Sequence, residues 1–335
     1  MPNHLVNDPV RSPGLQGRPT TFDRSIHAAG SKPERGLRKL NSDAASPKKG
    51  VAFRLLRLRW RRVRTMIGRL AGHFSGCFIR PIFGFGFDLA GCIYRVDGCE
   101  FEIPAHLTDR NYRSAFVFGE YESAERELIG RFLRPDDRVI ELGGCIGVLS
   151  CLVNSRLKSP GSHLVVEANP ELIPILSRHR ALNGAGFRIE ECAVSSEPEV
   201  NFAVHRLMTH SSVLAQPDAR LVKVHGRSLA DLHYSHGPFN TLLIDVEGSE
   251  LVVLKDSPHL LRDYRLVIIE LHRQLIGAEG VAVCRRILTS AGLRCSAVTK
   301  SVEAWIRPDL FTDHHNTVRA SEPTLDPAAY LGSYI

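Results

Sequence analysis

Carboxylates and a histidine follow two apolar runs in the second half of the chain. Asp245 closes the run 241–245 and is followed by Glu247, and His272 follows the run 265–271. A carboxylate or an imidazole placed beside a hydroxyl group can remove its proton, which is general base catalysis. Asp245 is the first candidate for this role, and His272 has the unperturbed pKa that best suits proton removal near neutral pH. The sequence therefore predicts a catalytic group of Asp245, Glu247 and His272.

Other roles for these side chains stay open. Asp245 and Glu247 could cap the helix that follows them, and His272 could be a packing residue in a loop. Glu250 could be structural or solvated, and Glu270 could orient a neighbouring side chain. Aspartate, glutamate and histidine together could also bind a divalent cation. The predicted chemistry does not require one, so we predict no metal site.

A glycine-rich turn follows the buried strand predicted at 139–142. Gly143, Gly144 and Gly147 have no Cβ atom, so the backbone can turn sharply and a ligand can approach it closely. Their order does not match G-x-G-x-x-G, the fingerprint of dinucleotide-binding turns. Glu141 lies just before the turn, where its carboxylate suits a cationic or amine-bearing ligand and would repel a pyrophosphate. A tight turn without any ligand is the simpler alternative.

A second acidic residue, Glu167, lies at the end of the strand predicted at 163–168. Doubly wound α/β folds use an acid at this position to hold the hydroxyl groups of a ribose. Asn169 opens the helix that follows, and Ala193 belongs to a third predicted strand, 187–194, where it would lie along the same pocket. These residues predict a nucleoside ligand without deciding which one.

Strands and helices alternate along the region that holds these residues. The alternation predicts an α/β fold with a doubly wound, Rossmann-like sheet. We predict a β-hairpin around Asp97-Gly98, a helix at 120–133, extra β-structure at 199–227 and, at 77–91, a connector interrupted by Pro81 and glycines. The predicted segments are a disordered basic tail (1–50), a basic amphipathic helix (51–76), an N-terminal addition of hairpin and helix (77–134), the α/β domain (135–310) and a C-terminal tail (311–335).

Excess positive charge is confined to the start of the chain. Residues 1–70 hold 16 of the 43 lysines and arginines but only 4 of the 36 acidic residues, so the rest of the chain is net acidic. We therefore predict no nucleic-acid partner for the catalytic region. Apolar and arginine side chains fall on opposite faces at helical spacing over 51–70. This segment could lie on an anionic membrane surface or pack on the domain with its arginines in water.

Targeting features are absent from the sequence pattern. The chain has no run of about 18 apolar residues, so no transmembrane helix is predicted, and its first residues do not form a secretory signal. The eight cysteines are scattered without a C-x-x-C pair, which favours reduced thiols over a zinc site or a disulfide framework. We predict a cytoplasmic protein, either free or held at the inner membrane face by residues 51–70. A start at Met66 would remove most of that segment.

From about Tyr121 to Ile306 the chain resembles the FkbM-type family of methyltransferases. Four blocks carry the resemblance, in the same order and with similar spacing: YES, DDRVIELGGCIGVLS, VVEANPELIPILSRHRALNG and LLIDVEGSELVVLKDSPHLL. The last block is the most specific, because DVEGSE followed by an apolar helix is close to a signature of the family. The chain departs from the family at Gly144-Cys145, where Ala-Asn is usual, and at Leu243, where a lysine is usual.

The resemblance implies methyl transfer from S-adenosylmethionine (SAM) to a hydroxyl group of a sugar, glycolipid or natural-product acceptor. It assigns SAM binding to Glu141, Gly143, Gly144, Gly147, Glu167, Asn169 and Ala193. Asp245, Glu247 and His272 would act on the acceptor hydroxyl. The two departures also allow a catalytically impaired module that only binds SAM or a glycan. A nicotinamide-dependent enzyme is disfavoured by Glu141 and the incomplete glycine fingerprint, and the sequence indicates no oligomeric state.

Overall fold

The computed structural model describes residues 76–205, 212 and 219–308, with side chains from residue 79 onward. These residues all belong to one compact unit. Both predicted tails and nearly all of the predicted basic helix lie outside the described residues. Within the described ranges, none of the helices combines the length and the apolar character that crossing a membrane requires.

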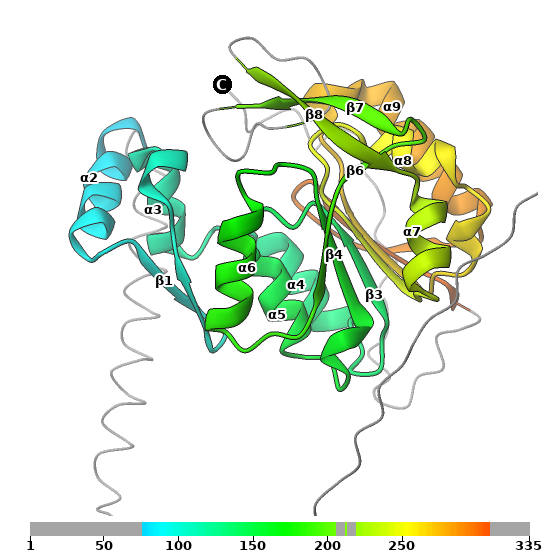
Figure 1. Ribbon diagram of the computed structural model, residues 1–335, viewed down its shortest axis with the longest axis horizontal. Coiled ribbons are helices and arrows are strands. Elements are labelled where there is room, and N and C mark those ends of the chain that lie inside the picture. The colour runs from blue at the N-terminus through cyan, green and yellow to red at the C-terminus, as the bar shows by residue number, and fades with distance from the viewer. Residues whose placement is uncertain (1–75, 206–211, 213–218, 309–335) are drawn as a thin grey trace, which may run out of the picture. The chain divides into compact units, whose positions relative to one another are not determined.

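The described residues form a central seven-stranded sheet (Figure 1). Across the sheet its strands are β11 (Arg294–Thr299), β12 (Val302–Ile306), β10 (Leu266–Glu270), β9 (Thr241–Ile244), β3 (Val139–Leu142), β4 (His163–Glu167) and β5 (Arg188–Glu191). The strands from β10 to β5 are parallel, and β12 runs antiparallel to both of its neighbours. The order of connection reverses between β3 and β9, and open α/β sheets bind ligands at such a switch point.

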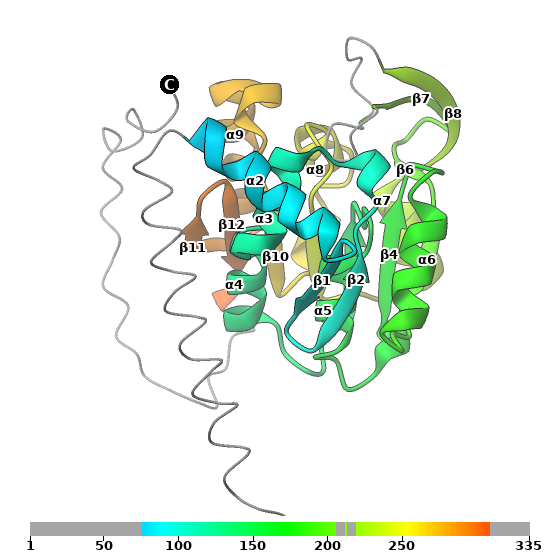
Figure 2. The same ribbon diagram turned by 90° about the vertical axis from the view of Figure 1, so that its left-hand side faces the viewer.

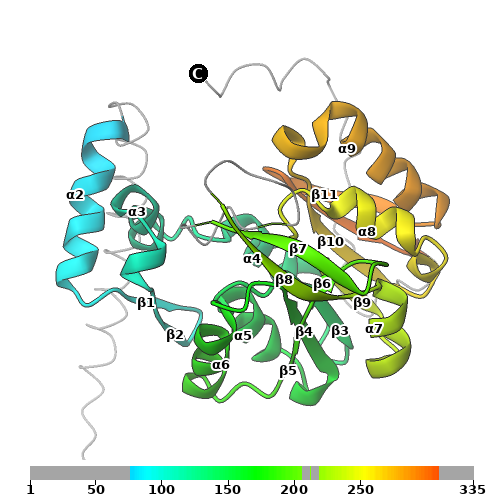
Figure 3. The same ribbon diagram turned by 45° about the horizontal axis from the view of Figure 1, so that its top comes forward.

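Helices cover both faces of this sheet, which confirms the predicted doubly wound α/β class. One face carries α4 (Ser123–Phe132), α5 (Val148–Asn154) and α6 (Ile173–Leu182), and the other carries α7 (Leu229–His236), α8 (Glu250–Asp256) and α9 (Arg273–Ser290) (Figures 1 and 3). Ile140 and Leu142 of β3 pack with the second set of helices, whereas Val139 packs with α4 and α5. Because both of their faces are buried, the inner strands β9 and β10 are nearly continuous apolar runs, whereas the edge strand β5 is charged and partly exposed.

The N-terminal addition consists of α2 (Gly76–Leu89), the strands β1 (Ile93–Val96) and β2 (Cys99–Glu102), and α3 (Arg110–Phe118). The predicted hairpin is confirmed, because β1 and β2 pair antiparallel. Asp97 and Gly98 between them both have positive φ angles, as a tight two-residue hairpin turn requires. Figure 2 shows α2 and α3 side by side next to this hairpin.

The structure corrects the prediction of a connector at 77–91, because α2 runs through Pro81. Two rings of α2 pack on rings of α3. The centroid distance is 4.9 Å from Phe83 to Phe118 and 5.8 Å from Phe87 to Phe116. Packing against a neighbouring helix therefore outweighs the helix-breaking tendency of the proline. The sequence pattern also fails to predict α3 and α7.

A smaller three-stranded sheet is formed by β6 (Ala193–Val194), β7 (Glu199–Val204) and β8 (Arg220–Arg227). The extra β-structure predicted at 199–227 is thereby confirmed. The strand predicted at 187–194 is split, because β5 joins the main sheet whereas β6 pairs with β8. Three-residue 3-10 turns occupy Ala105–Leu107, Pro160–Ser162 and Leu260–Arg262.

Candidate active site

A cavity of about 380 Å³ lies at the carboxyl ends of the parallel strands, at the switch point of the sheet. The turns after β3 and β9 converge there. A Cβ atom on Gly143 would come within 1.8 Å of the carbonyl oxygen of Asp245. Gly143 has a φ of +93°, a left-handed conformation that favours glycine. The predicted site residues found at the cavity wall are Gly143, Glu167, Ala193, Asp245, Glu247 and His272.

One wall of the cavity, the nucleoside wall, is made by Cys145, Glu167 and Ala193. The two oxygens of the Glu167 carboxyl group accept hydrogen bonds from the backbone N–H groups of Cys145 and Asn169, each at 2.7 Å. Burial raises the pKa of Glu167 to about 7 although these bonds favour its ionised form. The bonds hold the carboxyl group at the cavity, and each oxygen keeps a lone pair for a ligand hydroxyl.

Gly144 and Gly147 are not among the cavity-lining residues. They lie on the side of the turn that faces Val165 and Leu176. A Cβ atom on Gly144 would come within 2.3 Å of Val165 Cγ1, and one on Gly147 would come within 2.6 Å of Leu176 Cδ1. The structure thus gives both glycines a packing role, against β4 and α6, in place of direct contact with a ligand.

Glu141 does not reach this cavity, which corrects its predicted role as a cofactor ligand. Its side chain is buried, and its oxygens are bonded to Ser150 Oγ at 2.7 Å and to His163 Nε2 at 3.0 Å. Ser150 belongs to α5 and His163 to β4. Both oxygens of the Glu141 carboxyl group therefore link β3 to its neighbours α5 and β4.

Asn169 acts on the turn after β4 and is also absent from the cavity lining. Its buried side chain accepts a hydrogen bond from Glu171 N at 3.0 Å, while its own N–H group donates to Glu167. Asn169 therefore supports the nucleoside wall through the backbone. Its predicted contact with the cofactor is replaced by a role in orienting Glu167.

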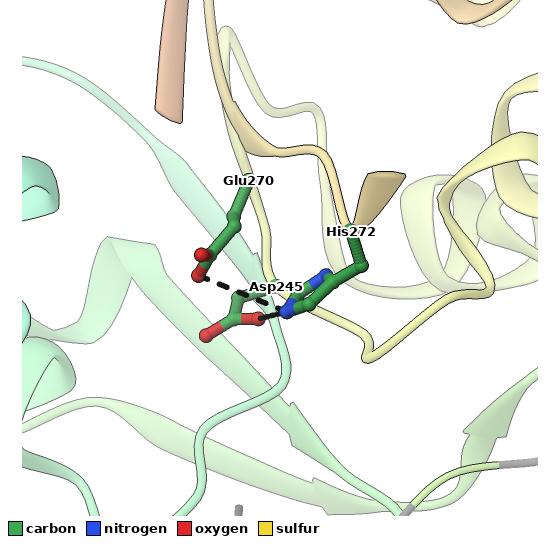
Figure 4. Close-up of side chains that lie close together, drawn as sticks. All are labelled: Asp245, Glu270 and His272. Carbon is green, nitrogen blue, oxygen red and sulfur yellow. Dashed lines mark ion pairs between the residues drawn. The ribbon is translucent and has the colours of Figure 1, made fainter. Parts of the chain in front are cut away.

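A second wall of the cavity, the acid wall, is formed by Asp245, Glu247, Glu270 and His272, which follow or end β9 and β10. His272 Nε2 lies 3.3 Å from a carboxylate oxygen of Glu247, 3.8 Å from Asp245 and 3.9 Å from Glu270. Figure 4 shows that Asp245, Glu270 and His272 point toward one another. On the other side of the ring, Nδ1 of His272 lies 2.8 Å from an oxygen of the fully buried Glu250.

The environment of His272 favours its protonated ring. Burial disfavours the charged ring, but the hydrogen bond to Glu250 and the charges of Asp245, Glu247 and Glu270 raise the pKa of His272 to about 10. A raised pKa makes the neutral ring less available to take a proton from an acceptor, and the role of His272 as a base stays a prediction. A protonated ring would instead stabilise the ionised carboxylates around it.

The pKa values of carboxyl groups in the acid wall are shifted toward neutral pH. Burial raises the pKa of Glu247 to about 7, and burial together with the charges of Glu270 and Glu247 raises the pKa of Asp245 well above its ordinary value. Such a carboxylate is a stronger base than one in water. The Asp245 side chain is 35% exposed at the cavity, with its Oδ1 atom buried on the side of His272, so an acceptor hydroxyl can approach the carboxyl group from the cavity.

The same cluster has the donor atoms of a cation site. Asp245, Glu270 and His272 each offer one ligand atom, and within the described part of the chain these atoms lie within 4.8 Å of one another. Two carboxylates and an imidazole at this spacing could share a divalent cation. In the geometry seen here His272 already lies within ion-pair distance of Asp245 and Glu270, so a bound cation and a protonated His272 would compete for the same carboxylates.

Sequence reasoning misses several residues that line the cavity. Tyr112 comes from α3, and Lys300 comes from the turn between β11 and β12. Tyr121 and Glu122 directly precede α4, and Glu125 lies in its first turn. Burial raises the pKa of Glu122 well above its usual range and that of Glu125 to about 7. Tyr121 and Glu122 lie in the first block of the FkbM resemblance, which could have indicated them. No comparable motif marks the other three.

No protein family model matches this sequence, and no curated protein matches it. A methyltransferase from Pyrococcus furiosus is 11% identical over 70% of this chain and 99% of its own, with a TM-score of 0.38. Fibrillarin from Aeropyrum pernix, with bound SAM, is 11% identical over 54% and 72%, with a TM-score of 0.33. The precorrin-6y C5,15-methyltransferase from Geobacter metallireducens is 12% identical over 62% and 92%, with a TM-score of 0.35. At TM-scores below 0.5 we base no functional argument on these structures.

Proposed function

We propose that this chain is a SAM-dependent O-methyltransferase of the FkbM type that its sequence resembles. The observation that carries the proposal is that one cavity at the switch point is lined by both the nucleoside wall and the acid wall. The nucleoside wall offers a fixed carboxyl group to ribose hydroxyls, and the acid wall offers basic carboxylates to an acceptor hydroxyl. Methyl transfer needs both walls in one place, because donor and acceptor must be aligned for the reaction.

The residues of the nucleoside wall fit SAM, which supplies a methyl group on a positively charged sulfur. Glu167 would accept hydrogen bonds from the ribose hydroxyls, as acids at this position do in doubly wound folds. Cys145 lies in the cavity wall with a φ of +46°, and the small side chain of Ala193 leaves room beside it. The carboxylates of the acid wall favour a sulfonium cation and disfavour the pyrophosphate of a nicotinamide cofactor.

Asp245 is the proposed general base. Its backbone lies against Gly143 where the ends of β3 and β9 meet, and its side chain is 35% exposed at the cavity, within reach of an acceptor hydroxyl. The acceptor hydroxyl transfers its proton to Asp245 while its oxygen forms a bond to the methyl carbon. Bound SAM would supply that methyl group and would leave as the neutral thioether, with the electron pair of the broken carbon–sulfur bond.

Glu247 and His272 act on Asp245 and on the acceptor. The charge of His272 lowers the pKa of both Asp245 and Glu247 against the effect of burial, so it keeps part of the carboxylate population ionised near neutral pH. Glu247 can accept a second hydrogen bond from a polyhydroxylated acceptor. We therefore propose a sugar, a glycolipid or a hydroxylated natural product as the acceptor, in line with the family resemblance.

The second candidate function is a module that binds SAM or a glycan without catalysis. It is motivated by the two departures from the family, at Cys145 and Leu243. Leu243 is buried in β9 in the core that includes residues of α4, and it does not line the large cavity. Of the two departures, only Cys145 lies at the cavity. The proposal of a non-catalytic module therefore depends on whether the Cys145 side chain abolishes catalysis.

Calorimetric titration of the full chain with SAM, its demethylated product and NAD tests the cofactor. We expect binding of SAM and of the product, and no binding of NAD. A folded sample that binds neither form of SAM would refute the methyltransferase proposal. Methyl transfer to a panel of hydroxylated glycans, measured against Asp245→Asn, then separates the enzyme from the binding module, because the module would bind SAM without turnover.

A further inference from the structure

α2 carries an apolar face that nothing in the described part of the chain covers. Ile82, Phe85 and Leu89 are 68%, 45% and 75% exposed, and we call them the apolar stripe. Their spacing of three and then four residues places them on one side of the helix. Aligned apolar side chains on one exposed face indicate an interaction surface, whereas single scattered ones are ordinary.

The other side of α2 is packed against α3. Phe87 stacks on Phe116 at 5.8 Å between centroids. Gly84 lets the two backbones approach so closely that a Cβ atom there would come within 1.9 Å of the carbonyl oxygen of Arg110. α3 also contributes Tyr112 to the cavity wall. Only α3 therefore separates α2, which carries the apolar stripe, from a residue of the cavity wall. Figure 2 shows α2 beside α3.

Basic residues lie next to the apolar stripe in space and precede it in the sequence. The guanidinium carbon of Arg110 lies 5.1 Å from the centroid of the Phe85 ring, and its side chain is 57% exposed and forms an ion pair with Asp88 of α2 at 3.4 Å. Residues 51–75, which lead into α2 along the chain, contain seven arginines and no aspartate or glutamate. Apolar side chains beside basic ones bind anionic membranes, because the apolar groups enter the headgroup region while the cations meet the lipid phosphates.

We propose that the apolar stripe of α2 docks this protein on an anionic lipid bilayer. The positive charge of residues 51–75 favours an anionic bilayer as the binding partner. A basic segment next to an exposed apolar face is complementary to a surface that is both negatively charged and apolar. Docking would hold the cavity near the lipid headgroups through α3. Combined with the proposed function, it favours an acceptor hydroxyl carried by a membrane lipid, but the docking itself does not depend on catalysis.

Vesicle flotation of the full chain tests the docking. We expect it to float with vesicles of phosphatidylcholine mixed with phosphatidylglycerol and not with phosphatidylcholine alone. The triple variant Ile82→Ser, Phe85→Ser and Leu89→Ser should bind the mixed vesicles about tenfold more weakly, because its stripe no longer enters the interface. Equal binding by the variant and the original chain would overturn the proposal, as would failure of the original chain to bind either vesicle.

A matched control removes apolar side chains that are equally exposed on other elements: Leu221→Ser, Tyr234→Ser and Val252→Ser. This control should float like the original chain, and an equal loss of binding would contradict a specific role for the stripe. Light scattering tests whether the stripe binds a second copy of this chain instead. If the stripe variant turns a dimer into a monomer and vesicles do not bind, the stripe is a contact between copies. SAM affinity of the stripe variant should stay within about twofold, which keeps this test separate from the proposed function.

Discussion

The nucleoside wall and the acid wall line the same cavity, but they are held in opposite ways. At the nucleoside wall, both oxygens of Glu167 accept backbone hydrogen bonds before any ligand is present. At the acid wall, carboxylates crowd around His272, and Oδ1 of Asp245 has no hydrogen-bond partner among the described residues. The first wall is held by backbone hydrogen bonds, whereas the second is held by ion pairs to His272 and by side-chain hydrogen bonds at His272 and Glu270.

This difference separates recognition from chemistry. A carboxyl group held by two backbone bonds has a defined direction, which lowers the entropy lost when a ligand binds. Carboxyl groups whose pKa is raised by burial and by one another are typical of groups that exchange protons. We therefore expect substitutions at the nucleoside wall to change affinity for SAM, and substitutions at the acid wall to change the rate of transfer.

The largest effect is expected from Asp245→Asn, which keeps the shape of the side chain but removes the base. The rate constant of methyl transfer should fall about 10²–10⁴-fold, the usual contribution of a positioned base. Calorimetry should show SAM affinity changed by no more than about twofold. Glu247→Gln is the matched comparison within the acid wall. If Glu247→Gln abolished transfer while Asp245→Asn kept it, the base would be Glu247.

Glu167→Ala should weaken SAM binding about 10–100-fold, because hydrogen bonds to a charged group are lost on the ligand side and the N–H group of Cys145 loses its acceptor. Calorimetric titration measures the effect. At saturating SAM the transfer rate should recover to near that of the original chain. A rate that stays low at saturation would contradict the separation of the two walls.

His272→Gln should move the acidic limb of the kcat/KM profile to higher pH. His272 lowers the pKa of Asp245 and Glu247, so a neutral side chain leaves both carboxyl groups protonated to higher pH. A shift of about one pH unit would reduce activity about tenfold on that limb, with recovery as pH rises. Glu270→Gln should shift the limb the other way, because the charge of Glu270 raises the pKa of Asp245. Parallel shifts in both variants would contradict this account.

Gly144→Ala should lower the free energy of unfolding by about 1–3 kcal/mol, because the added methyl group would overlap Val165 and the packed turn must move. Urea denaturation measures the change. In a Val165→Ala background the same substitution should cost less, since the overlapping methyl group is gone. Fully additive effects of the two substitutions would show that residue 144 is not limited by Val165.

The smallest effect is expected from removal of metal ions. Chelation with EDTA followed by assay in metal-free buffer should change the transfer rate by less than about twofold, because His272 already provides the positive charge among the carboxylates. A rate that is lost on chelation and restored by a divalent cation would show instead that Asp245, Glu270 and His272 share a metal.

Much of the nucleoside wall could be predicted from the sequence because its parts are close along the chain. A short apolar run followed by glycines predicts β3 and its turn, and an acid at the end of the next run predicts the place of Glu167. The acid wall is predictable in part, since Asp245 and His272 both follow apolar strands. Tyr112 and Lys300 could not be predicted, because they come from segments that join the cavity only when distant elements pack.

The sequence by itself determined the α/β class, the switch-point turn and the identity of the acidic residues behind β9 and β10. These follow from periodicity and turn chemistry, which act between neighbours in the chain. Only the tertiary structure decided that Glu141 is hydrogen-bonded to Ser150 and His163, and that carboxylates surround His272 and raise its pKa. Burial, a pKa and the partner of a buried group depend on contacts across the fold, because electrostatic and hydrogen-bond energies are set by what lies near in space.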